Sequence, residues 1–436
     1  MASVAKREWT HKGETKTAWV VRYTDQGGKR RMKTFEKKKD ADRFRSTVET
    51  EIENGTHVAD RASKTVKEAA EGYLLDCERR WKVADRMAGG TLHGHISRVN
   101  NHIIPNIGHM KIKDVTSDRV QFLIDDLSKH LAKATISNVM VTLIGIIRFS
   151  IKRRWITRNV LRDDPVQLPQ SNRKRRVAPS KAEISTLLEA SSRRLQGGFL
   201  ASAVNRYAIV RLGVFGGLRL GEMCALRWED IDIRRGVIHV RHSRSRYDGR
   251  KCPKSRAGVR SVPLTYPVYE ALCRVARLWR INEFVDKEAS DGGRSSKPSA
   301  LRKRKLDLYE AGKAFSVFGP DSFMDMSGDV LRTARGTPAR TNISDEWRRM
   351  MEDANLVDGD RVRFTIHSLR HAAASLLIEA GLPAMNLKTV IGHASVTTTY
   401  NVYGHLFPED ERTSRAAHGI AAAFGATRAL QEGVSR

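Results

Sequence analysis

The sequence is poor in cysteine and in aromatic residues, and it contains no long apolar run. Its 436 residues include four cysteines, and aromatic side chains make up 7% of the chain. Cys77, Cys224, Cys252 and Cys273 form no close pair and no zinc-ligand spacing, which argues against a disulfide framework and a zinc module. We therefore expect reduced thiols in a cytosolic protein.

Membrane and leader segments are also missing. No apolar run approaches the roughly 18 residues that a membrane-spanning helix requires. The first residues, Met1–Arg7, lack the apolar stretch of a secretory signal. These absences predict a cytoplasmic location and no membrane partner.

Acidic residues are scarce relative to basic ones. The chain has 78 Lys and Arg residues against 49 Asp and Glu, a net charge of +29. This excess favours a polyanionic partner, most simply nucleic acid, although a generally basic soluble protein would show it too. The length favours two or three domains, and 40% hydrophobic residues are enough for packed cores.

Residues 1–60 have the pattern of a small β-rich module. Strands are expected at Ala18–Tyr23 and Lys29–Phe35, followed by a helix from Asp40 to about Asn54. Such a hairpin can place its sheet in a DNA groove, although a solvated basic hairpin explains the pattern equally well. The side chains expected to contact DNA are Arg22, Lys29, Arg30, Arg31 and Lys33.

Residues 64–168 are predicted to be helical. Apolar residues at helical spacing indicate helices over Ser117–His130 and Thr135–Arg154. The second helix ends on Arg153 and Arg154, two candidate DNA contacts. Cations at this position also complement the helix dipole, so a structural role explains them equally well.

A basic linker is expected at residues 169–180, between flanking prolines. Its candidates for phosphate contact are Arg173, Lys174 and Arg175. A solvated linker is an equal alternative.

Residues 181–436 are predicted to form a larger mixed domain. Its expected helices and strands are Lys181–Ala190, Val204–Phe215, Gly236–Val240 and Val259–Leu264. Residues 286–314 are charged and rich in Ser, Gly and Lys, so we expect a surface insertion there.

Short motifs in this domain contain the side chains needed to cleave a phosphodiester without a metal. They are Gly217–Glu222, Pro253–Ser255, His367–His371, Ile391–His393 and Tyr400–His405. Cleavage by direct displacement needs an in-line nucleophile and cations that hold the nonbridging oxygens.

Arginine suits the second task because its planar fork binds phosphate and stays charged. Arg219 and Arg370 are the candidates. The alternative for Arg219 is an ion pair with Glu222, three residues further along the chain. Glu222 itself is expected to orient its neighbours rather than to react.

His367 and Arg370 share a helix face, so they can converge on one phosphate. His367 and His371 also have the spacing of a metal-binding pair. Ser368 follows His367 where a zinc-protease helix has glutamate, and no third ligand is evident. We therefore predict no metal site.

Tyr403 is the proposed nucleophile, and from the residues alone Tyr400 is an even competitor. A phenol needs a base or nearby cations, and we expect His367 to accept its proton. Lys254 is the expected general acid for the leaving 5′-oxygen, with Lys251 as its rival. His393 follows a glycine turn that can present its ring to the site.

These motifs resemble the tyrosine recombinase family, specifically phage-type integrases. The resemblance rests on Gly217–Arg219 with Glu222, Pro253–Ser255 leading into Arg260–Leu264, His367–His371, Ile391–His393 and Tyr403–Leu406. It implies a catalytic set of Arg219, Lys254, His367, Arg370, His393 and Tyr403, supported by Glu222. It also favours Tyr403 over Tyr400, because the family nucleophile stands just before a Gly-His-Leu-like tail.

The resemblance further implies a multidomain fold, mostly α with small β-sheets (α+β). Residues 1–60 would be an arm-type DNA-binding domain with a three-stranded sheet. Residues 64–168 would be a SAM-like core-binding domain, and residues 181–436 the mixed catalytic domain.

The implied function is site-specific integration of a phage or other mobile element through a 3′-phosphotyrosyl intermediate and a Holliday junction. The implied partners are double-stranded DNA attachment sites, three further copies of the chain in a tetramer, and DNA-bending or excision accessory proteins. No cofactor is implied. The alternatives are a non-catalytic DNA-binding regulator derived from a recombinase and a chromosome-resolution recombinase.

Overall fold

The computed structural model divides the chain into two compact units, Met1–Arg173 and Lys174–Arg436. Each unit is described by itself. The described residues are 2–11, 14–25, 28–54, 63–169, 178–193, 200–253, 256–290, 298–310, 326–339 and 343–407.

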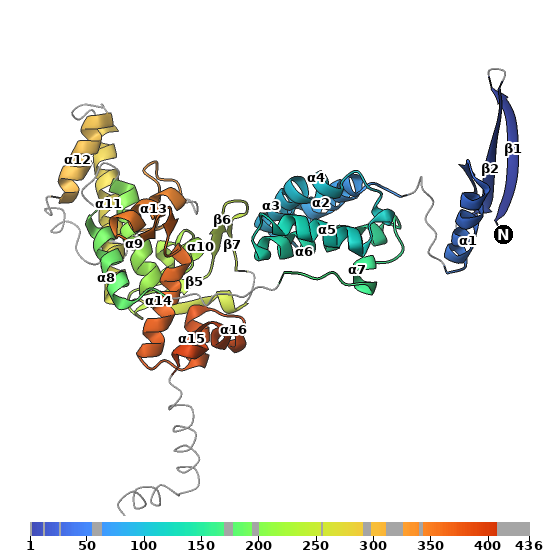
Figure 1. Cartoon of the computed structure of the whole chain (residues 1–436). Helices are drawn as coiled ribbons and strands as arrows, with labels where there is room; N and C mark the ends of the chain where they lie inside the picture. Colours follow the sequence, from blue (N-terminus) through green and yellow to red (C-terminus); the bar gives the residue numbers. More distant parts are fainter. Residues whose placement is uncertain are drawn as a thin grey trace, which may run out of the picture. The chain divides into compact units, whose positions relative to one another are not determined.

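The first unit begins with a three-stranded antiparallel sheet and a helix. The strands are β1 (Ser3–His11), β2 (Glu14–Thr24) and β3 (Arg30–Phe35), paired in that order. Helix α1 (Lys38–Glu53) packs on one face of the sheet (Figure 1). The apolar core between sheet and helix is small and contains Val21, Tyr23, Ala41 and Val48.

The rest of the first unit is helical. Its elements are α2 (Val66–Lys82), α3 (Gly89–Arg98), a π-helical turn (Val99–Ile103), α4 (Ile104–Ile107), α5 (Ser117–Ser128), α6 (Lys133–Lys152) and α7 (Val160–Asp163). Helix α2 starts at a capping box. The Thr65 hydroxyl accepts the Glu68 backbone N–H, and the Glu68 carboxylate accepts that of Thr65. The two bonds satisfy amide groups that a helix start otherwise leaves unpaired.

Helix α6 is the central helix of this domain. Val139, Leu143, Ile146 and Ile147 point into one apolar core, as their spacing predicts. Within the described residues α6 is also the one helix long and apolar enough to cross a membrane by length and composition. Half of that window is buried in the domain, which is what a core helix shows.

The second unit combines helices with short strands. Its helices are α8 (Lys181–Arg193), α9 (Leu200–Val214), α10 (Leu220–Met223), α11 (Tyr266–Ser290), α12 (Pro298–Glu310), α13 (Ser344–Asp353), α14 (Ile366–Glu379), α15 (Ala384–Ile391) and α16 (Val396–Tyr403). Helix α9 is buried almost throughout and contacts α8, α11 and α14, so it forms the centre of the unit.

The described part of this unit also contains three small antiparallel sheets. Strands β4 (Ile231–Asp232), β5 (Val237–Val240) and β8 (Arg260–Pro263) form the first. The two hairpins are β6 (Ser243–Ser245) with β7 (Gly249–Lys251), and β9 (Val357–Asp358) with β10 (Arg361–Val362). The predicted fold class, mostly α with small sheets, is confirmed.

The expected surface insertion at residues 286–314 contains the end of α11 and the whole of α12. Helix α12 is more than a surface feature, because Leu301, Leu308 and Tyr309 pack against the main core of the unit. An ion pair of 2.7 Å between Arg304 and Glu288 joins it to α11. The sequence analysis did not predict this helix, because most of its residues are polar and only one narrow face is apolar.

Candidate active site

A buried carboxylate organises the first part of the site. One oxygen of Glu222 accepts hydrogen bonds from Arg219 Nη1 at 2.8 Å and Arg260 Nη1 at 3.0 Å. The other accepts from Arg260 Nη2 and from the backbone N–H of Arg219, at 2.8 and 2.9 Å. The ion pair considered as an alternative for Arg219 is therefore present, and it leaves the Arg219 side chain 38% exposed.

Burial raises the pKa of Glu222, but the hydrogen bonds and charges of Arg260 and Arg219 outweigh it and lower the pKa to about 2. Glu222 is thus ionised at neutral pH. Arg260 is the residue that sequence reasoning missed. Val262 stands two residues after Arg260 in the predicted strand, so the two side chains share a face, and both are buried in the structure. This spacing was the signal in the sequence that Arg260 points inward.

Arg370 lies 1% exposed on α14. Its guanidinium donates to the backbone carbonyl of Gly217 at 2.8 Å and to that of Ile391. Burial, together with the charges of Arg219 and Arg260, lowers the pKa of Arg370 to about 9. It stays charged at neutral pH, and its fork is held in one orientation.

Two glycines make this arrangement of carbonyls possible. Gly217 and Gly392 have φ angles of +63° and +70°, a conformation that L side chains rarely adopt. A Cβ atom at Gly392 would stand 2.9 Å from the carbonyl oxygen of Ala257. The carbonyl of Gly392 accepts from Arg219 Nη2 at 3.2 Å. The motifs around both glycines therefore orient arginines through their backbone.

Tyr403 ends α16 and is 3% exposed, whereas Tyr400 is 48% exposed. The Tyr403 hydroxyl lies 2.7 Å from His371 Nδ1. The His393 ring stacks parallel to the Tyr403 ring, with 6.1 Å between centroids. The structure thus surrounds Tyr403 with site residues, while Tyr400 faces outward.

A hydrogen bond of 3.0 Å between Nδ1 of His393 and the Thr399 hydroxyl fixes the orientation of the His393 ring. Burial, followed by the positive charges of Arg370 and Arg219, lowers the pKa of His393 to about 4. The ring is therefore neutral at pH 7, and it can donate a hydrogen bond without adding charge.

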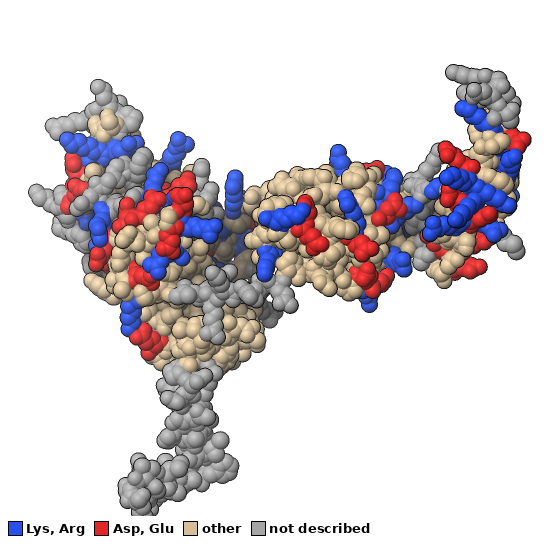
Figure 2. All heavy atoms as spheres, in the orientation of Figure 1, with Lys and Arg blue, Asp and Glu red and all other residues tan. Residues whose placement is uncertain are grey.

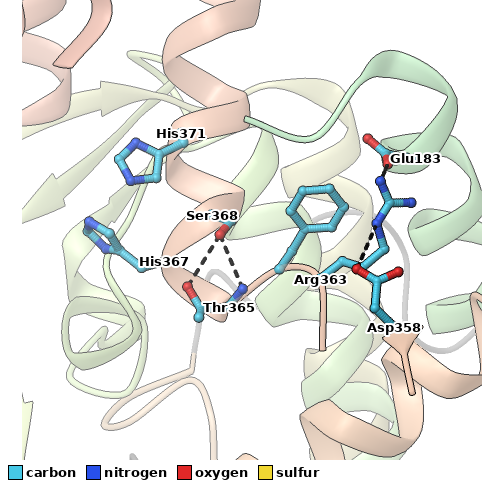
Figure 3. A pocket seen from close by; sticks show the side chains of 8 residues that line it. Glu183, Asp358, Arg363, Thr365, His367, Ser368 and His371 are labelled. Atoms are coloured by element: carbon cyan, nitrogen blue, oxygen red, sulfur yellow. Dashed lines mark hydrogen bonds and ion pairs between the residues drawn. The ribbon is translucent and has the colours of Figure 1, made fainter. Parts of the chain in front are cut away.

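His367 is exposed, and its ring packs edge-on against His371 at 5.0 Å between centroids. Both rings project from the same side of α14 (Figure 3). Our expectation paired His367 with the tyrosine hydroxyl, but the hydrogen bond described above joins His371 to it. The two histidines line a cavity of about 780 Å³ together with Glu183, Asp358, Arg363, Phe364, Thr365 and Ser368.

The residues that the structure describes contain no group of three or more His, Cys, Asp or Glu side chains placed to hold an ion. His367 and His371 pack ring against ring, and His371 contacts Tyr403.

Several predicted positions lie outside the described residues. They are Lys254, Arg173, Lys174 and Arg175. Lys251, the rival of Lys254, is exposed and stands 3.7 Å from Asp248.

The candidate DNA contacts on the N-terminal sheet divide between its two faces. Neighbouring residues of a strand point to opposite faces. Arg31 and Lys33 pair with Tyr23 and Val21, which are buried against α1, so they lie on the helix side. Lys33 Nζ stands 4.6 Å from the Phe44 ring centroid, a cation–π contact.

Arg31 is occupied as well, because its Nε donates to Asp25 at 2.8 Å. The five candidate DNA contacts therefore do not lie on one face of the sheet. Arg22 and Arg30 lie on the open face, and Lys29 is exposed in the preceding turn. Lys and Arg side chains gather over this module in Figure 2.

Arg153 and Arg154 follow α6 and are both exposed. The Arg153 guanidinium also lies 5.2 Å from the Phe149 ring centroid. Arg154 has a φ of +58°, so the chain turns at this position. Their placement is compatible with phosphate contact and with helix termination alike.

The chain is similar to known proteins in sequence and in fold. A model of the phage integrase family matches residues 180–410, more than half of the chain. The chain is 24% identical to prophage integrase IntR of Escherichia coli over 311 residues, which are 68% of this chain and 66% of that protein. It is 25% identical to the ICEBs1 integrase of Bacillus subtilis, with 72% and 73% covered. The chain thus spans about two thirds of the length of these relatives.

Solved structures with a similar fold include the Tn1549 transposon integrase in complex with a circular intermediate DNA. The TM-score is 0.56 at 20% identity, covering 82% of this chain and 99% of that one. A λ integrase dimer bound to a COC′ core site matches with a TM-score of 0.50 at 17% identity, covering 88% and 91%. At these identities the likeness shows the fold.

Proposed function

The chain belongs to the phage integrase family of tyrosine recombinases, and we propose that it is a site-specific DNA recombinase, the integrase of a phage or other mobile element. One observation carries the proposal. A buried tyrosine hydroxyl contacts a histidine and stands in the field of a fixed arginine cluster, since Tyr403 and Arg370 interact electrostatically.

In the proposed cleavage step, Arg219 and Arg370 hold the nonbridging oxygens of the scissile phosphate. Tyr403 attacks phosphorus, the 3′-phosphotyrosyl bond forms, and the bond to the 5′-oxygen breaks. Lys254 donates a proton to that leaving oxygen, and His393 donates a hydrogen bond to the phosphate. Pre-oriented cations favour this step because they need no reorganisation as charge develops.

Rejoining follows when a 5′-hydroxyl from a partner duplex attacks the phosphotyrosyl bond. The covalent link conserves the energy of the phosphodiester, so the proposed reaction uses no ATP, metal or other cofactor. Two duplexes have four strands to exchange, and each copy of the chain supplies one Tyr403. We therefore propose a homotetramer that exchanges strands in pairs through a Holliday junction.

The proposed division of labour follows the domains. Residues 1–60 bind arm-type DNA sites through the open sheet face. Residues 64–168 bind the core site, and the linker at 169–180 joins them to the catalytic domain at 181–436. The partners are double-stranded attachment sites and DNA-bending or excision accessory proteins, and the site of action is DNA in the bacterial cytoplasm.

The test is recombination between two plasmid-borne attachment sites, taken from DNA flanking the gene, in buffer containing EDTA. We compare the unaltered protein with Tyr403→Phe and Tyr400→Phe. We expect joined products from the unaltered protein and from Tyr400→Phe, and none from Tyr403→Phe. The Tyr403→Phe protein should still bind the sites, because only the hydroxyl is removed.

Other outcomes identify the alternatives. Full recombination by Tyr403→Phe would refute the assignment of the nucleophile. A clean footprint with no strand cleavage by the unaltered protein would support the non-catalytic regulator. Reaction only at a chromosomal resolution site would support the chromosome-resolution recombinase.

A further inference from the structure

The hydroxyl of Tyr403 lies 2.7 Å from the Nδ1 atom of His371. Both side chains are buried, with 3% of Tyr403 and 7% of His371 exposed. The distance lies within the range of O–H hydrogen bonds, and it is the reach required of a general base. His371 is outside the catalytic set that the motifs imply.

The other two histidines are placed differently. The ring planes of His393 and Tyr403 are within 5° of each other, with 6.1 Å between the ring centroids. The Nδ1 atom of His393 lies 3.0 Å from the Thr399 hydroxyl, so that atom of the ring is already engaged in a hydrogen bond. His367 is exposed, and its ring packs edge-on against His371. The ring of His371 is inclined at 61° to the phenol and meets it at the hydroxyl.

We propose that His371 is the general base that takes the phenol proton of Tyr403 during strand cleavage. The inference rests on the proposed function, since it concerns the same reaction. As the bond between Tyr403 and phosphorus forms, the proton moves from the hydroxyl to Nδ1 of His371. The imidazolium returns the proton to the tyrosine oxygen when a 5′-hydroxyl displaces it during rejoining. The proton thus stays within one pair of residues in both directions.

The surrounding charge sets the condition for this transfer. Arg370 directly precedes His371 in the chain, and Arg219 and Arg260 share the single carboxylate of Glu222. This excess of positive charge opposes an imidazolium in the free protein. The negative charge of a bound phosphate offsets it. We therefore expect Tyr403 to keep its proton until DNA occupies the site.

The experiment measures the single-turnover rate of covalent adduct formation on a nicked attachment-site duplex, with protein in excess. In His371→Asn, the amide lies near the position of Nδ1 and can still form a hydrogen bond, but it cannot take a proton. His371→Ala removes both the hydrogen bond and the proton acceptor. We expect both variants to react about 100-fold or more slowly than the unaltered protein. Incorporation of 3,5-difluorotyrosine at position 403, a more acidic phenol, should restore much of the lost rate in both.

The matched control is His95→Asn. His95 is a buried histidine of the first unit whose Nε2 lies 3.4 Å from the hydroxyl of Tyr73, and it is neither a proposed catalytic residue nor a proposed DNA contact. It should not change the adduct rate at saturating protein. Thermal unfolding of each variant identifies any that fails to fold, and His371→Asn, the milder replacement, is the variant we expect to stay folded.

An unchanged rate in His371→Asn would overturn the proposal, because an amide cannot act as a base. A loss that the fluorinated tyrosine leaves unrelieved would also overturn it and would indicate a positioning role. These results leave the proposed function intact, because the unaltered protein still forms the adduct. Absence of the adduct from the unaltered protein would instead count against the proposed function itself.

Discussion

Two buried tyrosine–histidine pairs, one in each unit, have different surroundings. Tyr73 and His95 meet at 3.4 Å inside the apolar core of the helical domain. Tyr403 and His371 meet at 2.7 Å beside a cluster of arginines. Burial raises the pKa of Tyr73 far above its usual range, which leaves it an inert phenol. We infer that a histidine neighbour alone does not make a tyrosine reactive. Tyr73 has Arg80 and Arg98 near it, whereas Tyr403 lies near guanidinium groups that are fixed by the Glu222 carboxylate and by backbone carbonyls.

The largest expected effect comes from weakening those cations. Arg370→Lys replaces a fork that satisfies two carbonyls with a single ammonium. We expect adduct formation at saturating protein to fall about 100- to 1000-fold, with DNA affinity changed only a few-fold. Gel analysis of adduct formation against time measures the rate.

The control for this change lies beside the other pair. Arg98 interacts electrostatically with Tyr73, so Arg98→Lys alters the cation near the unreactive tyrosine. It should leave the adduct rate unchanged at saturating protein. An unchanged rate of adduct formation in Arg370→Lys would contradict the claim that the fixed arginines distinguish the Tyr403–His371 pair from the Tyr73–His95 pair.

The next effect concerns the support of the cluster. Arg260→Met leaves the buried carboxylate of Glu222 with one side-chain partner in place of two. We expect the free energy of unfolding to fall by about 3–5 kcal/mol, since an incompletely paired charge remains buried. The double variant Arg260→Met with Glu222→Gln should lose less free energy of unfolding than the two single variants lose in sum, because both substitutions remove the same interaction. Urea denaturation measures each variant.

An exposed ion pair provides the matched control. Arg348 and Glu352 meet at 3.0 Å with about half of each side chain exposed. Arg348→Met should change the free energy of unfolding by less than about 1 kcal/mol. Equal losses in Arg260→Met and Arg348→Met would show that the cluster is not held as described.

A smaller effect separates binding from chemistry. Arg22→Ala and Arg30→Ala remove cations from the open sheet face, whereas Lys33→Met alters the helix-facing side. On arm-type DNA we expect each arginine change to reduce the slope of log affinity against log salt by about 1. Lys33→Met should leave the slope unchanged. A reduced slope in Lys33→Met, measured by anisotropy titration, would show that both faces contact DNA.

The smallest effect is a pH dependence of stability. The pKa of His393 is lowered to about 4 from a usual value of 6.5, so the unfolded chain binds a proton that the folded chain refuses. Stability is therefore lost as the pH falls from 6.5 to 4. We expect His393→Asn to reduce this loss on the order of 1 kcal/mol, discounted for partial exposure, or about 2–4 °C in Tm.

His95 sharpens this measurement. Burial also holds the pKa of His95 below its usual range, so His95→Asn should reduce the same acid loss in the first unit. DNA should protect only the site histidine, because a bound phosphate raises the pKa of His393. Equal responses of the two variants to DNA would contradict the difference in surroundings.

The sequence predicted the elements whose signal is local. The apolar spacing of α6 predicted its buried residues. The short motifs selected Arg219, Arg370 and His393, which lie close together in the structure. Strand β1 was not placed, because Ser3–His11 is mostly polar and gains order by pairing with β2. Helix α12 was predicted as a surface insertion because its few apolar residues acquire meaning only against α11.

The contacts between distant motifs were not predictable in the same way. Arg260 is 38 residues from Glu222, and His371 is 32 residues from Tyr403. Spacing on one helix placed His367 and Arg370 together but could not choose which histidine meets a tyrosine on another helix. The sheet register likewise decided which basic residues face outward, and register follows from pairing rather than composition.

The most direct test of the account is to identify the residue that becomes linked to DNA. The unaltered protein is incubated with a nicked attachment-site duplex, and the adduct is digested and its peptides are mapped by mass spectrometry. We predict a nucleotide mass on the peptide that contains Tyr403, at that residue. Linkage at Tyr400, or tight binding with no linked peptide, would contradict the claim that the buried tyrosine beside the arginine cluster is the nucleophile.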